Sequence, residues 1–224
     1  MITRPIFKPQ HAGELGQSGR LPDPPRPYID MHQYPYATAA FTILDAHFRE
    51  RPDVFVGGEG YLCRNTRDRS DWVKPDCLVA FGVDPDAILD RNGYIIDEVG
   101  KPPDFVLEIA SSTTGRADYT TKRDIYAGQG VGEYWRFDST GGRFHDAALT
   151  GEVLANGAYE PLPLRRGTDG VIRGHSPVLG LELHWDDGRL RFYDPAAGEY
   201  MPDLAEAKTE LQFLREEVRR LQSE

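Results

Sequence analysis

Two acidic residues on short apolar segments are the groups of this chain best suited to bind a hard metal cation. Asp76 opens the segment Asp-Cys-Leu-Val-Ala-Phe after Pro75, and Glu108 lies near the end of Asp-Phe-Val-Leu-Glu-Ile-Ala. Runs this apolar are typical of central strands with both faces covered, where a charged carboxylate needs a partner. If the two segments form adjacent antiparallel or bent strands, the carboxylates of Asp76 and Glu108 could lie close together. With the carbonyl of Ile109 as a further ligand, the two carboxylates could then bind Mg²⁺ or Mn²⁺. Such a site supports metal-assisted hydrolysis of a phosphodiester.

A lysine downstream of Glu108 could supply the positive charge that this chemistry uses. Lys122 lies four residues after Asp118 and four before Tyr126, so the three side chains share one face of an expected helix. Its ammonium could pair with Asp118 or point towards Glu108 and orient the attacking water. Taken singly, each residue has a commoner role: a turn or cap for Asp76, an ion pair for Glu108, extension to water for Lys122. Their arrangement together favours a catalytic site.

The elements expected around these residues alternate between strands and helices. Apolar residues at helical spacing predict a helix over residues 36–51. Capping and turn residues at 111–115 and glycines at 128 and 130 predict a second helix over residues 116–127. Apolar runs predict strands, the first of them turned at its Gly-Gly pair, over residues 54–63, 76–81, 104–110 and 133–138. The strand, helix, strand order after residue 104 predicts a crossover unit on a mixed sheet. Short strands with glycine turns, including a hairpin at 185–190, are expected between residues 143 and 194.

Length and composition predict one compact domain with appendages. With 224 residues, 39% of them hydrophobic, the chain is long enough for a single core. We expect an irregular arm over residues 1–35, a catalytic domain over 36–200 and a C-terminal helix over 201–224. No apolar run could span a bilayer and no signal peptide is recognisable, so a cytoplasmic protein without membrane contact is expected. Cys63 and Cys77 lack zinc-site spacing and are expected to be reduced.

The charge balance limits how this chain could contact nucleic acid. Its formal net charge of -10 argues against a protein that binds DNA phosphates over its whole surface, so any contact with DNA must be local. Basic residues gather before Asp76 and after Glu108, at Arg64, Arg67, Arg69, Lys74, Arg116, Lys122 and Arg123. For each cluster a solvated loop or helix face is the commoner explanation.

The C-terminal segment has the pattern of a coiled coil. Its apolar residues recur in alternating steps of three and four, at Leu204, Ala207, Leu211, Leu214, Val218 and Leu221. This spacing is a heptad seam over three heptads, and in a parallel pair the flanking acids Asp203 and Glu210 can meet Lys208 and Arg215 of the partner chain. The pattern predicts a homodimer. An amphipathic helix packed on its own domain is an equally open alternative, because three heptads is a marginal length.

The segment from residue 75 to residue 138 carries a resemblance to a known family. The stretch PDCLVAF, followed by PPDFVLEIASSTTGRADYTTKRDIYAGQGVGEYWRFD, resembles the Uma-two family of restriction endonucleases within the PD-(D/E)xK superfamily. The likeness extends more loosely over residues 36–194. It implies an α/β fold of the α+β mixed-sheet kind, with a restriction-endonuclease-like core and flanking helices. In that core, Asp76 and Glu108 are implied to bind the metal.

The resemblance also implies roles for two residues outside the acidic pair. The usual lysine of the superfamily lies two residues after the acid, where this chain has Ala110. Relatives in this family carry the lysine on the following helix, which matches Lys122. An acid before the Pro-Asp pair often completes such sites, and Glu59 in GGEGYL is the best match. An exposed turn residue is the equally open alternative for Glu59.

Three functions remain open from the sequence. They are a Mg²⁺- or Mn²⁺-dependent endonuclease acting on DNA, a catalytically silent nuclease fold that binds or scaffolds partners through its C-terminal helix, and hydrolysis of another phosphodiester. The acidic pair with Lys122 favours the first over the second, because a silent site would be free to lose unfavourable buried charges. Neither a GxSxG elbow, an HExxH motif nor a P-loop occurs, so those sites are set aside.

Overall fold

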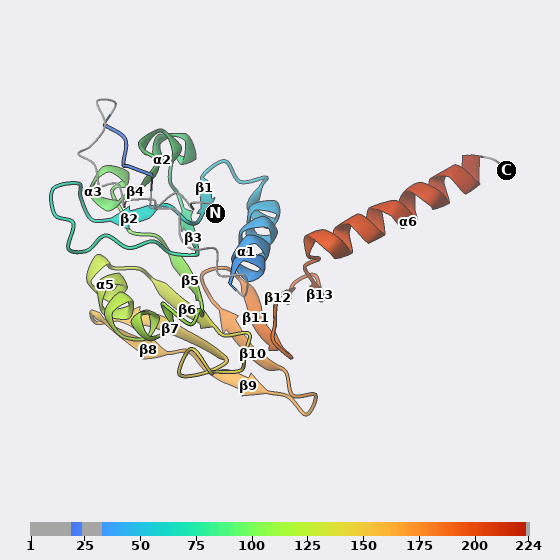
Figure 1. Ribbon diagram of the computed structural model, residues 1–224. Helices are drawn as coiled ribbons and strands as arrows, with labels where there is room; N and C mark the ends of the chain where they lie inside the picture. The colour runs from blue at the N-terminus through green and yellow to red at the C-terminus, as the bar shows by residue number, and fades with distance from the viewer. Residues whose placement is uncertain (1–18, 24–32, 223–224) are drawn as a thin grey trace, which may run out of the picture.

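A mixed sheet of six strands lies at the centre of the computed structural model, which describes residues 19–23 and 33–222 (Figure 1). In spatial order its strands are β1 (Val54–Gly57), β3 (Cys77–Phe81), β5 (Phe105–Ile109), β6 (Glu133–Phe137), β7 (Leu149–Ala155) and β8 (Ala158–Pro161). β5 and β6 run parallel, and every other neighbouring pair in this sheet is antiparallel. The expected α/β class with a mixed sheet is confirmed. Most of the expected arm over residues 1–35 lies outside the described residues.

One face of this sheet carries helix α1 and a second sheet. α1 (Tyr34–Phe48) has a proline in its first turn and ends ahead of Pro52, close to the helix expected over 36–51. The second sheet is antiparallel, in the order β13 (Glu199–Tyr200), β12 (Arg189–Asp194), β11 (Leu181–Asp186), β10 (Ile172–Ser176) and β9 (Leu164–Arg166). Leu44 of α1, Trp135 of β6 and Leu183 of β11 are fully buried in the core that joins these layers.

The second sheet contains the hairpin that the sequence predicts. β11 and β12 pair with Trp185 opposite Leu190 and Asp186 opposite Arg189. The two residues between the strands, Asp187 and Gly188, have φ of 46° and 82°. Two left-handed residues are what a two-residue hairpin turn requires, and Asp-Gly is a preferred pair there.

The opposite face of the mixed sheet is covered by the crossover between β5 and β6. Where the sequence predicts one helix over residues 116–127, the structure has two, α4 (Gly115–Asp118) and α5 (Thr121–Gln129). Thr120 separates them, because its hydroxyl donates to the carbonyl of Arg116 at 2.7 Å and its backbone, at φ −123° and ψ −98°, is not helical. Tyr126 of α5 packs against Tyr134 of β6. The predicted crossover is therefore correct, and the prediction of a continuous helix is wrong.

Smaller elements complete the molecule. β2 (Tyr61–Cys63) and β4 (Gly93–Ile95) form a parallel pair beside α2 (Pro85–Arg91) and α3 (Ile96–Val99). β1 and β2 belong to different sheets, so the chain does turn at its Gly-Gly pair. α6 (Leu204–Gln222) extends away from the other elements, and none of its residues is buried (Figure 1). Within the described residues, no helix has the length and apolar character needed to cross a membrane.

Candidate active site

The pairing of β3 with β5 brings the two acidic residues together. These strands run antiparallel with Cys77 opposite Leu107, and the same register places Asp76 opposite Glu108. Asp76 is 5% exposed and Glu108 is 0% exposed. The amide N–H of Ile109 donates to Asp76 Oδ2 at 2.7 Å, which ties the end of β5 to the start of β3. Neighbouring antiparallel strands thus unite the carboxylates in the way that the sequence suggests.

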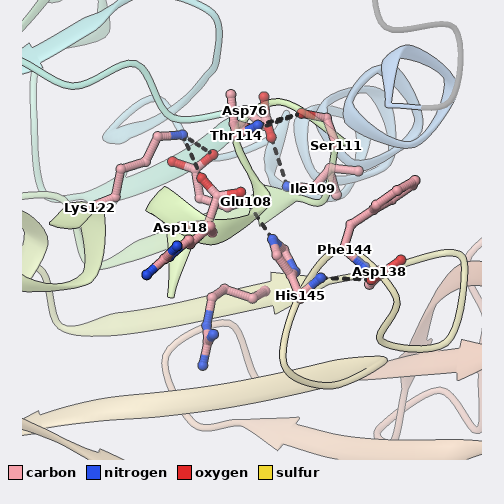
Figure 2. A network of polar contacts seen from close by, with 12 residues as sticks. Asp76, Glu108, Ile109, Ser111, Thr114, Asp118, Lys122, Asp138, Phe144 and His145 are labelled. Carbon is pink, nitrogen blue, oxygen red and sulfur yellow. Dashed lines mark hydrogen bonds and ion pairs between the residues drawn. The ribbon is translucent and has the colours of Figure 1, made fainter. Parts of the chain in front are cut away.

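Lys122 reaches this acidic pair from the first turn of α5 (Figure 2). Its Nζ lies 2.9 Å from Glu108 Oε2 and 2.9 Å from Asp118 Oδ1, so both pairings considered from the sequence occur at once. The hydroxyl of Tyr126, one turn further along α5, donates to Glu108 Oε1 at 2.5 Å. The two helices of the crossover therefore keep Asp118, Lys122 and Tyr126 on one face despite the break between them.

A buried histidine extends the network beyond Asp118. His145 Nε2 lies 3.0 Å from Asp118 Oδ2, and both side chains are fully buried. Asp138, which follows β6, fixes the backbone at this point, because its carboxylate accepts the N–H groups of Phe144 and His145 at 2.7 and 2.8 Å (Figure 2). Sequence reasoning missed His145 and Asp138, since neither belongs to a recognisable motif.

Gln33, the residue before α1, was also missed. Its Nε2 lies 2.7 Å from Asp76 Oδ1 and 2.6 Å from Asp76 Oδ2. Because Oδ2 also accepts the amide of Ile109, both oxygens of Asp76 are hydrogen-bonded. A glutamine beside a helix start has many ordinary explanations, so the sequence contains no signal for this contact.

Buried negative charge exceeds buried positive charge at this site. Three carboxylates, those of Asp76, Glu108 and Asp118, lie around the single ammonium of Lys122. Burial raises the pKa of Asp76 and of Glu108 above the ordinary carboxyl values, and the attraction of Lys122 opposes this only in part. Burial alone would lower the pKa of Lys122, but the three carboxylates outweigh it and raise that pKa well above the ordinary lysine value. Lys122 therefore stays protonated at neutral pH.

The donor set suits a hard divalent cation. Carboxylate oxygens are ligands that Mg²⁺ and Mn²⁺ prefer, and a cation would offset the excess of buried negative charge. Within residues 19–23 and 33–222, no group of three or more His, Cys, Asp or Glu side chains is arranged to hold a metal ion. Asp76 and Glu108 are the two predicted side-chain ligands that the described structure brings together. The carbonyl of Ile109 stays a predicted ligand, since the contact that Ile109 makes with Asp76 is through its N–H.

Glu59, the candidate third acid, is not joined to this network. Its carboxylate pairs with Lys74 at 2.6 Å, and its backbone N–H donates to the carbonyl of Pro75 at 3.0 Å. Glu59 is exposed and has a φ of 61°, so it occupies a turn, as the alternative interpretation expects. The role of Glu59 as a metal ligand stays a prediction.

Some of the basic residues near the acidic pair are used within the fold. Arg123 pairs with Glu152 at 2.7 Å, and Arg64 donates to the carbonyl of Gly128 at 2.7 Å. Arg116, on α4, is exposed, and its side chain forms no ion pair within the described part of the chain. Arg116 therefore differs from Arg123 and Arg64, whose side chains are held by contacts within the fold.

A comparison with protein-family models identifies one family. A family model described as "Uma2: Putative restriction endonuclease" matches residues 8–186, which is more than half of the chain. Among solved structures, a "putative nuclease belonging to DUF820 from Anabaena variabilis ATCC 29413" is similar at 15% identity and a TM-score of 0.43. That match covers 64% of this chain and 73% of the other. No significant match to a curated protein was found.

Proposed function

The chain belongs to the Uma2 family of restriction-endonuclease-like proteins, and we propose that it is a metal-dependent endonuclease that hydrolyses phosphodiester bonds in DNA. One observation carries this proposal above the others. Asp76, Glu108 and Lys122 lie together in a buried site where carboxylates outnumber cations. Strongly perturbed titratable groups that surround one another are typical of functional sites, because a fold by itself gains nothing from uncompensated buried charge.

Each residue of this site has its own role in the proposed hydrolysis. Asp76 and Glu108 would hold Mg²⁺ or Mn²⁺, with the carbonyl of Ile109 and the carboxylate of Glu59 as further candidate ligands. The cation would supply Lewis acidity at the scissile phosphate. Lys122 stays protonated, so it orients the attacking water as a hydrogen-bond donor and stabilises developing negative charge.

Three further side chains hold Glu108 and Lys122 in place. Tyr126 donates to Glu108, which fixes the carboxylate against α5. Asp118, which is itself hydrogen-bonded to His145, forms a second ion pair with the ammonium of Lys122. Partners of this kind orient the groups that touch metal or substrate, so we assign Asp118 and His145 as positioning residues.

Contact with DNA is expected to be confined to the surroundings of the site. The chain has a formal net charge of -10, so most of its surface would repel phosphates. Arg116 is exposed on α4, two residues before Asp118, and could bind a phosphate beside Lys122. Arg116→Ala should therefore weaken DNA binding without abolishing metal binding.

Cleavage assays with matched variants test this function. Purified protein is incubated with supercoiled, linear and single-stranded DNA in Mg²⁺ or Mn²⁺, and metal binding is followed by calorimetry. We expect metal-dependent cleavage that Asp76→Ala and Lys122→Ala abolish, whereas Asp90→Ala, which removes an exposed carboxylate on α2, has no effect. Absence of both cleavage and metal binding would refute the nuclease. Cleavage of RNA or of a small phosphodiester, but not of DNA, would support metal-dependent phosphodiester hydrolysis and contradict DNA as the substrate.

A second candidate function is a catalytically silent binding or scaffold protein. The observation that favours it is α6, whose apolar residues are exposed along the whole helix. Such a protein would have no use for the buried excess of carboxylates around Lys122, which is why we favour the nuclease. The assay above distinguishes them, because a silent scaffold neither cleaves DNA nor binds the metal.

A further inference from the structure

Helix α6 presents an apolar face that stays exposed among the described residues. Its 19 residues include none that is buried. Leu211 and Leu214 are each 48% exposed, and Val218 is 51% exposed. An isolated helix of this length is marginal in water, because most helix stability in proteins comes from packing of an apolar face. The apolar face of α6 therefore calls for a partner that the described residues do not supply.

The first turn of α6 is tied to the second sheet. Asp203 accepts the N–H of Glu206, and Glu206 accepts the N–H of Asp203, which is a reciprocal capping box. Glu206 also pairs with Arg191 at 3.0 Å and with Arg189 at 3.3 Å, both on β12. These contacts fix the point at which α6 leaves the second sheet, and the following turns extend away from it (Figure 1). The alternative of a seam packed on its own domain is therefore not what the structure has.

We propose that α6 pairs in parallel with α6 of a second copy of this chain. The contact is the apolar seam, formed by the a and d positions Leu204, Ala207, Leu211, Leu214, Val218 and Leu221. Val218 at an a position, with leucine at the neighbouring d positions Leu214 and Leu221, is typical of two-stranded coils. A single seam on one face is also what a pair of helices can bury completely.

Charged residues beside the apolar seam select the parallel orientation. The g positions Glu210 and Glu217 are acidic, whereas the e positions Lys208 and Arg215 are basic. In a parallel pair, Glu210 faces the partner's Arg215, which is an attractive contact. In an antiparallel pair, g faces g and e faces e, so acid would meet acid and base would meet base. Neither Glu210 nor Arg215 forms an ion pair among the described residues, so both are available to a partner.

Parallel pairing has a consequence for the position of the catalytic domains. The helix is 19 residues long, or about 28 Å at 1.5 Å per residue. A parallel coil brings the two copies of residue 204 together at one end of this rod, so both domains lie at that end. The pairing itself is independent of the proposed function; only the closeness of two nuclease sites rests on it.

The molar mass of the full chain in solution tests the pairing. Light scattering or sedimentation over a range of concentrations should show a dimer that dissociates on dilution. Leu214→Lys places a charge in the apolar seam and should give a monomer. Phe213→Lys is the matched control, because residue 213 is 64% exposed and lies outside the seam. A monomeric wild type at every concentration, or a dimer that Leu214→Lys leaves intact while circular dichroism shows a folded protein, would overturn the proposal.

Crosslinking tests the orientation. Leu221→Cys puts two thiols at facing d positions only in a parallel pair, so mild oxidation should join two chains covalently. Phe213→Cys, which points away from the seam, should stay uncrosslinked under the same conditions. The native Cys63 and Cys77 are buried and do not interfere. A dimer in which Leu221→Cys fails to crosslink would reject the parallel arrangement.

Discussion

At the scale of single residues, the excess of carboxylates around Lys122 should make stability depend on pH. Burial raises the pKa of Asp76 and Glu108, so the folded protein holds their protons to a higher pH than the unfolded chain does. Between the unfolded and folded pKa values, the folded protein binds more protons, and the free energy of unfolding falls as the pH rises. Lys122 does not contribute to this slope near neutral pH. Its pKa is about 10.4 in the unfolded chain and higher in the folded protein, so Lys122 is protonated in both states at neutral pH.

Denaturant unfolding in EDTA at a series of pH values measures this slope. Glu108→Gln removes one of the titrating carboxyls and should flatten it, and saturating Mg²⁺ should flatten it in the wild type by favouring the ionised carboxylates. Glu199→Gln, at an exposed strand end, is the control and should leave the slope unchanged. Burial lowers the pKa of His184, which makes the free energy of unfolding rise with pH over the same range. The comparison between wild type and Glu108→Gln is therefore decisive, and an unchanged slope in Glu108→Gln would contradict the charge imbalance at the site.

The contact between Asp118 and Lys122 gives a second prediction at this scale. Asp118→Asn keeps the size of the side chain but removes one of the two negative charges within 2.9 Å of Lys122 Nζ. We expect kcat to fall by about 10- to 100-fold, as is usual when a group that orients catalytic residues is lost, with KM for DNA nearly unchanged. Asp124→Asn, on an exposed position of the same crossover, should leave both constants alone. A rise in KM with unchanged kcat would instead assign Asp118 to substrate binding.

Residue types explain which parts of the site could be predicted from the sequence. Asp76, Glu108 and Lys122 can be detected because each is a charged residue with apolar or aromatic neighbours. Such an exception to the apolar pattern can be read directly from the sequence. His145 and Gln33 could not be found, because their contacts depend on which distant segments fold together. A buried histidine and a helix-flanking glutamine have no spacing of their own that distinguishes them from ordinary residues.

At the scale of elements, the turn between β1 and β2 sets the position of Asp76. A Cβ added at Gly58 would lie 2.2 Å from the main-chain carbonyl oxygen of Asp76, so Gly58→Ala must displace the chain ahead of β3. We expect a loss of about 1–3 kcal/mol in the free energy of unfolding, together with weaker metal binding. Gly128→Ala in α5 meets nothing within 4 Å and should instead stabilise the protein by at most about 1 kcal/mol. Denaturation curves and metal titrations of both variants check these effects.

The elements differ in how far local sequence determines them. The first helix, the β11–β12 hairpin and the core strands follow from apolar spacing and turn residues, and the structure confirms them. The division of the crossover at Thr120 could not be predicted, because a threonine hydroxyl that bonds the carbonyl four residues earlier is compatible with either a continuous or a broken helix. The grouping of strands into two sheets likewise depends on long-range packing. Trp135 fits between the sheets because Gly151 and Gly174 have no Cβ to meet its ring.

At the scale of the whole molecule, pairing through α6 should decide which product is formed from supercoiled DNA. A parallel coil holds two domains at one end, so a dimer carries two sites that can address the two strands of one duplex. We expect the wild type to produce linear DNA early, whereas the Leu214→Lys monomer should accumulate nicked circles, because a single site cuts one strand in each encounter. Phe213→Lys should behave as the wild type.

The rate of the first cut per active site separates this effect from damage to the chemistry. Residue 214 lies on α6, which extends away from the mixed sheet that contains β3 and β5 (Figure 1). The first cut should therefore be equally fast in all three proteins. Gel electrophoresis of the time course gives both quantities from one experiment. If the monomeric variant linearises DNA as readily as the wild type, paired sites are not needed for double-strand cleavage, and the dimer must serve another purpose. If the first cut itself slows, α6 contributes to the site in a way that its exposed position does not predict.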